Sequence, residues 1–155
     1  ARRAVGQRPD RMTRMMDHTS QPAHAVKAAC EAVVLTFFHA LDTRRHDAAA
    51  ALMAGDGVWL RQGQRLCGPQ EVLDALNARA PDRSTCHVIT NLRLLDHGER
   101  GATVGYFLIA YDSVPQAQGG APRLAAIREC RDVLVDTANG WRLADKSSRR
   151  HLPPE

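Results

Sequence analysis

The 155-residue chain has the length of one ordinary domain, which buries about two-thirds of the surface that its unfolded form exposes. Its net charge of +4 comes from the first 16 residues, with five arginines and one aspartate, because residues 17–155 carry 16 Lys and Arg against 16 Asp and Glu. A neutral body with 5% aromatic residues lacks the charge pattern of nucleic-acid-binding proteins, so we expect no nucleic-acid partner.

Cysteine spacing and hydropathy further restrict the classes of protein to which the chain can belong. The four cysteines lie far apart among apolar residues, a pattern that predicts buried free thiols and neither a disulfide framework nor a zinc site. No glycine-rich phosphate loop or metal triad is visible, so we expect no cofactor and no metal. No apolar run approaches about 18 residues and the N-terminus has no hydrophobic signal core, which predicts a cytoplasmic protein without a membrane partner.

The first half of the chain has helical periodicity. Residues 1–20 lack an apolar period and are expected to be a flexible basic leader before a single domain at 21–151 and a tail at 152–155. A helix is predicted from Pro22 to about Thr43, because Val26, Cys30, Val33, Phe37 and Leu41 form one stripe, with Asp42 at its margin.

Shorter elements follow this helix. A short helix is expected at 47–53, ended by Gly55, then a strand at 58–61, a turn at 62–63, an extended piece around Leu66, and a third helix from Gly68 to Ala80.

The second half changes to strand periodicity. Long strands are predicted at 84–95, 102–113 and 124–136, with a fourth at 141–150, and turns at 96–99 and 137–140 join them as hairpins. Three helices followed by a meander predict an α+β fold, in which a curved antiparallel sheet carries the helices on one face.

Several segments together resemble one family. The order of elements and the segments at 41–47, 58–59, 66–68, 85–91 and 140–142 are similar to the nuclear transport factor 2-like superfamily, in its SnoaL-like branch, over roughly residues 23–150. The resemblance implies a cone-shaped sheet with the three helices on its concave face, a deep apolar pocket for a small apolar ligand, and often a homodimer formed through the sheet. Enzymes, oxygenase subunits and transport adaptors share this fold.

Within that branch the chain resembles the scytalone-dehydratase-like pattern, in which an Asp at the end of the first helix orients a His on the first long strand. Asp42 and His87 match these two positions and are the candidate catalytic residues. A carboxylate that fixes the imidazole tautomer lets the other ring nitrogen remove a proton α to a carbonyl and return it to a leaving hydroxyl. The alternative is that His87 is a core histidine that joins sheet and helix through Asp42.

Three departures from that pattern favour an apolar substrate. Leu41 and Trp59 stand where the dehydratase has pocket tyrosines, and Phe107 stands where a second histidine is expected. Elimination without the second polar anchor is expected to be slower, or to need water.

Strand alternation supplies the other pocket candidates. Ile89 and Asn91 share the side of His87, while Phe107, Ile109 and Tyr111 are expected to face the pocket from the next strand, and Phe37 from the first helix. Tyr111 either donates to a carbonyl oxygen or packs at the pocket rim.

Strand alternation alone does not decide which side of the third long strand faces inward. Resemblance to the oxygenase small subunit favours Asp132 facing inward with Arg128, and predicts Arg128 or Arg142 as the partner of Asp132.

Three hypotheses follow. The first is a lyase or isomerase that acts on a small apolar hydroxy-carbonyl compound of polyketide or steroid type. The second is a ligand-binding domain without catalysis, and the third is an assembly subunit of the oxygenase small-subunit type.

Overall fold

The computed structural model describes residues 21–115 and 119–154, so the predicted leader lies outside the described residues. Its elements follow the chain in this order: α1 (Ala23–Asp42), α2 (His46–Ala50), β1 (Met53–Arg61), β2 (Gln64–Cys67), α3 (Gly68–Asn77), β3 (Ser84–His97), β4 (Gly101–Ser113), β5 (Arg123–Thr137) and β6 (Gly140–Leu152). The strands form one six-stranded sheet in the order β2-β1-β6-β5-β4-β3.

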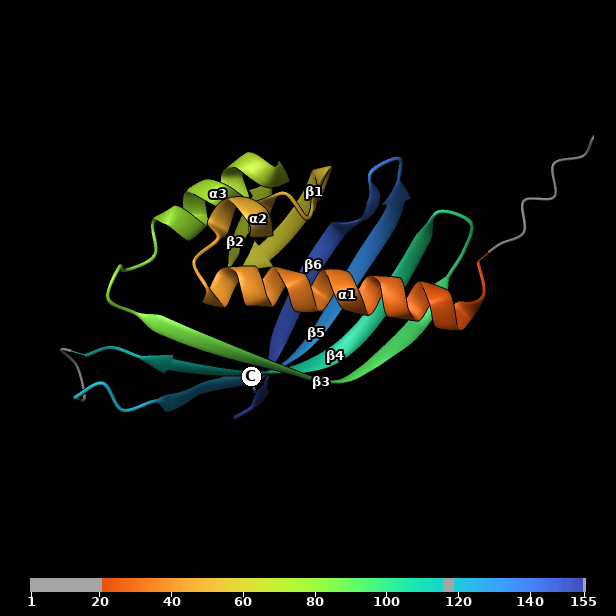
Figure 1. Ribbon diagram of the computed structural model, residues 1–155. Helices are drawn as coiled ribbons and strands as arrows, with labels where there is room; N and C mark the ends of the chain where they lie inside the picture. The colour runs from red at the N-terminus through yellow and green to blue at the C-terminus, as the bar shows by residue number, and fades with distance from the viewer. Residues whose placement is uncertain (1–20, 116–118, 155) are drawn as a thin grey trace, which may run out of the picture.

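The predicted α+β class is confirmed, with the helices on one side of a curved sheet (Figure 1). All neighbouring strands are antiparallel except β1 and β6, which pair in parallel, so the sheet is mixed where an antiparallel sheet was expected. Strand β1 precedes the meander of β3 to β6 in the chain. It pairs with β6, the last strand of that meander, and runs in the same direction.

Helix α1 lies across the concave face of the sheet (Figure 1). Its buried side chains repeat at helical spacing, as predicted, and supply much of the core. By length and composition alone α1 could span a membrane, and it is the only helix of the described chain that could, but its apolar stripe packs on the sheet.

The segment after α1 differs from the prediction. The short helix ends at Ala50, and Met53 already begins β1, so Gly55 lies inside a strand. The Leu143 amide donates to the Leu52 carbonyl at 2.8 Å, where the chain begins to pair with β6. This strand pairing overrides the helical propensity of the alanine run.

Strand β3 contains a bulge that positions the site. Asn91 has a φ of 55°, and the register against β4 shifts between Thr90 and Arg93. An extra residue exchanges the two faces of a strand beyond it. His87 therefore lies on the helix side before the bulge, while Leu92 and Leu94 pack on the core after it.

Candidate functional site

The end of α1 meets the first half of β3 through one carboxylate. The Asp42 Oδ1 atom lies 2.6 Å from His87 Nδ1, and Asp42 Oδ2 accepts the His87 backbone amide at 2.8 Å. Both side chains are mostly buried, with 12% of His87 and 18% of Asp42 exposed. Because a carboxylate only accepts, the ring donates from Nδ1 and its Nε2 atom is left to the cavity side.

Two further side chains hold this pair in place. Thr85 donates its hydroxyl to Asp42 Oδ1 at 2.8 Å. Arg79 donates to the Thr85 hydroxyl at 2.9 Å and to the Leu41 carbonyl at 3.1 Å. Helix α1, the end of α3 and strand β3 are thus joined in one hydrogen-bond chain.

The Asp42 carboxyl is ionised at neutral pH. Partial burial is the largest single influence and by itself raises its pKa. The hydrogen bonds from the His87 ring and amide, the His87 charge and the Thr85 hydroxyl outweigh burial and lower the pKa below its ordinary value of 3.8.

A cavity of about 390 Å³ opens beside this pair, between the helices and the concave face of the sheet. Its volume is in the range of small-molecule sites. His87 is part of the wall, together with apolar groups from α1, β1 and β4: Phe38, Leu41, Trp59, Leu60, Leu108 and Ala110. Many of the remaining wall residues are charged, so the predicted apolar pocket is a mixed one.

The structure corrects the predicted contribution of β4. Register pairs His87 with Ala110, and directly paired residues point to the same side of a sheet. The even-numbered residues of β4 are therefore on the helix side, where Leu108, Ala110 and Asp112 line the cavity. Phe107, Ile109 and Tyr111 are on the outer face. The Phe107 ring packs on His151 at 4.8 Å between centroids, and Tyr111 is 38% exposed.

The other predicted lining residues divide into two groups. Leu41, Trp59 and Arg128 line the cavity as expected. Phe37 and Ile89 pack in the core instead, and Asn91 is exposed at the bulge of β3.

A buried charge cluster lies at the base of the cavity. Asp132 faces inward as the resemblance implied, but its partner is Lys146, directly opposite on β6, and neither predicted arginine. The Lys146 Nζ atom lies 2.8 Å from Asp132 Oδ2 and 2.8 Å from the Tyr106 hydroxyl, which itself donates to Asp132. Burial of Asp132, whose Oδ1 has no partner among the described residues, raises its pKa, and the Lys146 charge opposes this.

Sequence reasoning missed three side chains of the site. Lys146 was not among the predicted site residues, yet it lines the cavity and is 3% exposed. Phe38 was outside the predicted stripe, yet its ring centroid lies 5.0 Å from that of His87 and 4.5 Å from Lys146 Nζ. Nothing in the sequence alone indicated that Arg79 contacts this site. The strand alternation of Lys146, Ser148 and Arg150 was the available signal for Lys146.

The thiols supply no nucleophile to this cavity. Cys130 lines it, but burial raises the pKa of this thiol to about 11, and the same cause raises that of Cys30 to about 11. Cys86 is exposed on the outer face, where a buried thiol was expected. Within the described ranges no group of three or more His, Cys, Asp or Glu side chains is arranged to hold a metal ion.

The chain belongs to the SnoaL-like domain family, whose model matches residues 22–146. No protein of curated function matches the sequence.

Solved structures share the fold at low identity. A putative aromatic ring hydroxylase from Novosphingobium aromaticivorans is 16% identical with a TM-score of 0.74, over 86% of this chain and 94% of that one. A protein from Catenulispora acidiphila in complex with S-DNPA is 20% identical with a TM-score of 0.70, over 82% and 94%. A hexachlorocyclohexane dehydrochlorinase is 18% identical with a TM-score of 0.71, over 83% and 86%.

The charge cluster predicts a non-additive mutant cycle. Lys146→Met leaves Asp132 buried without its cation and is expected to cost about 3–5 kcal/mol of unfolding free energy, whereas Lys146→Met with Asp132→Leu recovers most of this loss. Urea denaturation measures both. Lys27→Met, which breaks the exposed pair with Glu31, is the control and should cost about 0–1 kcal/mol. A cost for Lys146→Met no larger than the control contradicts a charged Asp132.

Asp42 predicts a pH-dependent contribution to stability. Because its pKa is lower in the folded state, the contribution is present above the ordinary value of 3.8 and is lost as the pH falls through the folded-state pKa. Asp42→Asn should therefore cost about 1 kcal/mol near neutral pH and progressively less in acid. Denaturation at successive pH values measures the difference, with the exposed Asp74→Asn as control. A difference that is independent of pH contradicts the assignment.

Proposed function

We propose that the protein is a cytoplasmic enzyme of dehydratase or isomerase type that acts on a small hydroxy-carbonyl compound with a polyketide- or steroid-like apolar body. The observation that carries this proposal is the 2.6 Å contact between Asp42 Oδ1 and His87 Nδ1 at the wall of the cavity. The family and a neighbour named as a dehydrochlorinase support the class of reaction, and the bound S-DNPA of another neighbour supports a small-molecule ligand.

The proposed chemistry needs one proton acceptor and one proton donor, and the imidazole serves as both. His87 Nε2 removes a proton from the carbon α to the substrate carbonyl, and the electron pair moves to form an enolate. In a dehydration the same nitrogen returns the proton to the β-hydroxyl, which leaves as water as the double bond forms. In an isomerisation the proton goes to another carbon.

The surroundings favour this proton transfer. Asp42 is ionised and holds the ring in one tautomer, which stabilises the imidazolium formed in the first step. The enolate charge develops in a wall that contains Arg79 and Lys146, and fixed positive groups in a water-poor site stabilise such a charge. Tyr111, which the sequence offered for this purpose, lies on the opposite face of the sheet.

His87→Ala is expected to keep the fold and to lower turnover by about 100-fold or more, because the proton shuttle is lost with little core volume. The assay follows water loss and deuterium uptake from D2O by mass spectrometry over a panel of cyclic hydroxy-ketones. Asp42→Asn should lower the rate with less effect on substrate affinity. His97→Ala, exposed at the far end of β3, is the matched control. Equal rates for the native protein and His87→Ala contradict the catalytic proposal.

A second candidate function is assembly with another subunit through the outer face of the sheet, either a second copy or an oxygenase-type partner. One apolar row crosses four strands of this face, because register places Val88, Ile109, Ile127 and Leu152 directly opposite one another. Val88 is 43% and Leu152 51% exposed. Contiguous exposed apolar surface is typical of protein contacts.

The second copy is the occupant that we test, and we expect a dimer in sedimentation experiments. Val88→Glu should convert the dimer to a monomer with an unchanged circular dichroism spectrum, because it places a charge within the apolar row. Leu35→Glu, on the exposed side of α1, is the control and should leave the dimer intact. A native monomer at high micromolar concentration contradicts the homodimer.

A further inference from the structure

The cavity collects positive charge out of proportion to the rest of the chain. Of the 16 Lys and Arg in residues 17–155, seven line the cavity, whereas only one of the 16 Asp and Glu does. The body is neutral as a whole, so this concentration is a property of the fold that the composition conceals.

Three of the seven cations form ion pairs with carboxylates, and Arg79 is held by hydrogen bonds next to the Asp42–His87 pair. Arg83 and Arg123 both bind Asp112, the carboxylate of the wall, at 2.9 and 2.7 Å. Lys146 is paired with Asp132, and Arg79 donates to the Thr85 hydroxyl and to a backbone carbonyl. The carboxylates neutralise Arg83, Arg123 and Lys146, whereas the acceptors of Arg79 are neutral and its charge lies near the Asp42–His87 pair.

Arg128 and Arg61 are placed differently. Arg128 donates from Nε to the Ser148 hydroxyl at 2.8 Å and from Nη2 to the Ser148 carbonyl at 3.1 Å, and both acceptors are neutral. The Arg61 guanidinium lies 5.5 Å from the centroid of the Trp59 ring. Neither arginine forms an ion pair with a carboxylate in the part of the chain that the structure describes.

The wall around these two arginines is rich in cations. Arg128 is directly opposite Arg150 in the register of β5 and β6. Desolvation and the charge of Arg83 lower the pKa of Arg61. An anion beside Arg128 would accept the guanidinium hydrogen bonds that Ser148 does not use.

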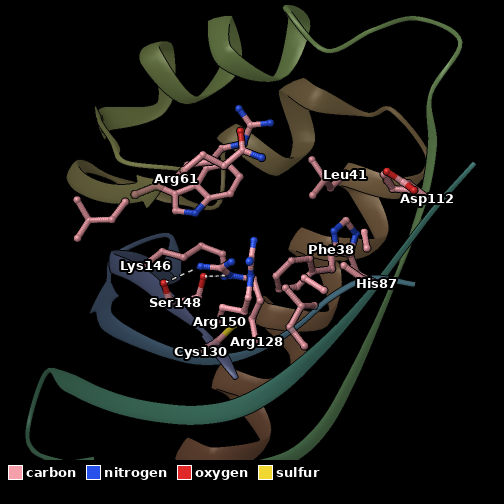
Figure 2. Close-up of a pocket in the computed structure, with 18 of the residues that line it drawn as sticks. Phe38, Leu41, Arg61, His87, Asp112, Arg128, Cys130, Lys146, Ser148 and Arg150 are labelled. Carbon is pink, nitrogen blue, oxygen red and sulfur yellow. Dashed lines mark hydrogen bonds between the residues drawn. The ribbon is translucent and has the colours of Figure 1, made fainter. Parts of the chain in front are cut away.

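From this arrangement we infer that the ligand carries an oxyanion, a carboxylate or a phosphate ester, which Arg128 binds at the side of the cavity away from His87. Figure 2 shows Lys146, Arg128 and Arg150 on one side and His87 with Asp112 on the other. The apolar body of the ligand then lies against Phe38, Trp59 and Leu108. The inference rests on the proposed function in that it takes the cavity as the ligand site, and it narrows the substrate to an anionic one.

Matched probes test the charge requirement by isothermal titration calorimetry. The native protein should bind 2-naphthoate about tenfold or more tighter than 2-naphthamide, which has the same ring system and no charge. Arg128→Met should lower the affinity for 2-naphthoate about tenfold and change that for 2-naphthamide by less than about twofold. 2-Naphthyl phosphate is the third probe, and whichever anion binds more tightly identifies the type of oxyanion.

Three variants serve as controls. Arg93→Met removes the same charge from an exposed position of β3 and should leave every affinity unchanged. Arg128→Lys, which keeps the charge but not the fork of donors, should retain part of the preference for 2-naphthoate. His87→Ala should keep the full preference, because the proposed oxyanion site is on the other side of the cavity.

The outcomes separate this inference from the proposed function. Equal affinity of the native protein for 2-naphthoate and 2-naphthamide overturns the inference alone, and loss of the preference in His87→Ala overturns the position of the oxyanion. A retained preference without any hydroxy-ketone turnover supports the inference and contradicts the catalytic proposal. If none of the three probes binds, both are contradicted.

Discussion

The carboxylate of Asp42 is the interaction on which the site depends. It accepts hydrogen bonds from the backbone of β3, from the His87 ring and from Thr85, so one side chain fixes the end of α1 against the sheet and the tautomer of the imidazole. These two roles are inseparable, because any displacement of the helix end changes the ring orientation. Arg79 extends the constraint to α3 through Thr85 and the Leu41 carbonyl, which ties the site to three elements of the fold.

A second polar centre lies across Phe38 from the first. The ammonium of Lys146 is enclosed by the rings of Phe37, Phe38 and Tyr106 and binds Asp132 beneath them. Buried ion pairs seldom add net stability over apolar replacements, so their cost is often associated with specificity or function. Here the pair places a cation in the wall of a cavity whose other side carries His87. The same helix face that fills the core thus separates and positions both polar centres.

Local patterns were enough for most of the elements, whereas the family resemblance supplied the Asp42–His87 positions. The stripe of α1, the Asn-Gly turn at Gly140 and the alternating strands are signals that neighbours in sequence carry, and the structure has α1 and the four long strands where they predict them. Pairing between residues far apart in the sequence determines the features that local patterns did not predict. Which residues of β4 face His87 depends on register, the end of α2 depends on β6, and the buried position of Lys146 depends on its pairing with Asp132.

The segregation of charge within the fold has a consequence for encounter with ligands. The cavity wall holds seven Lys and Arg against one Asp, so it is strongly positive although residues 17–155 are neutral as a whole. A cleft of one sign with low-dielectric walls focuses field lines toward its opening. A small anion that reaches the opening is therefore drawn toward the cavity wall.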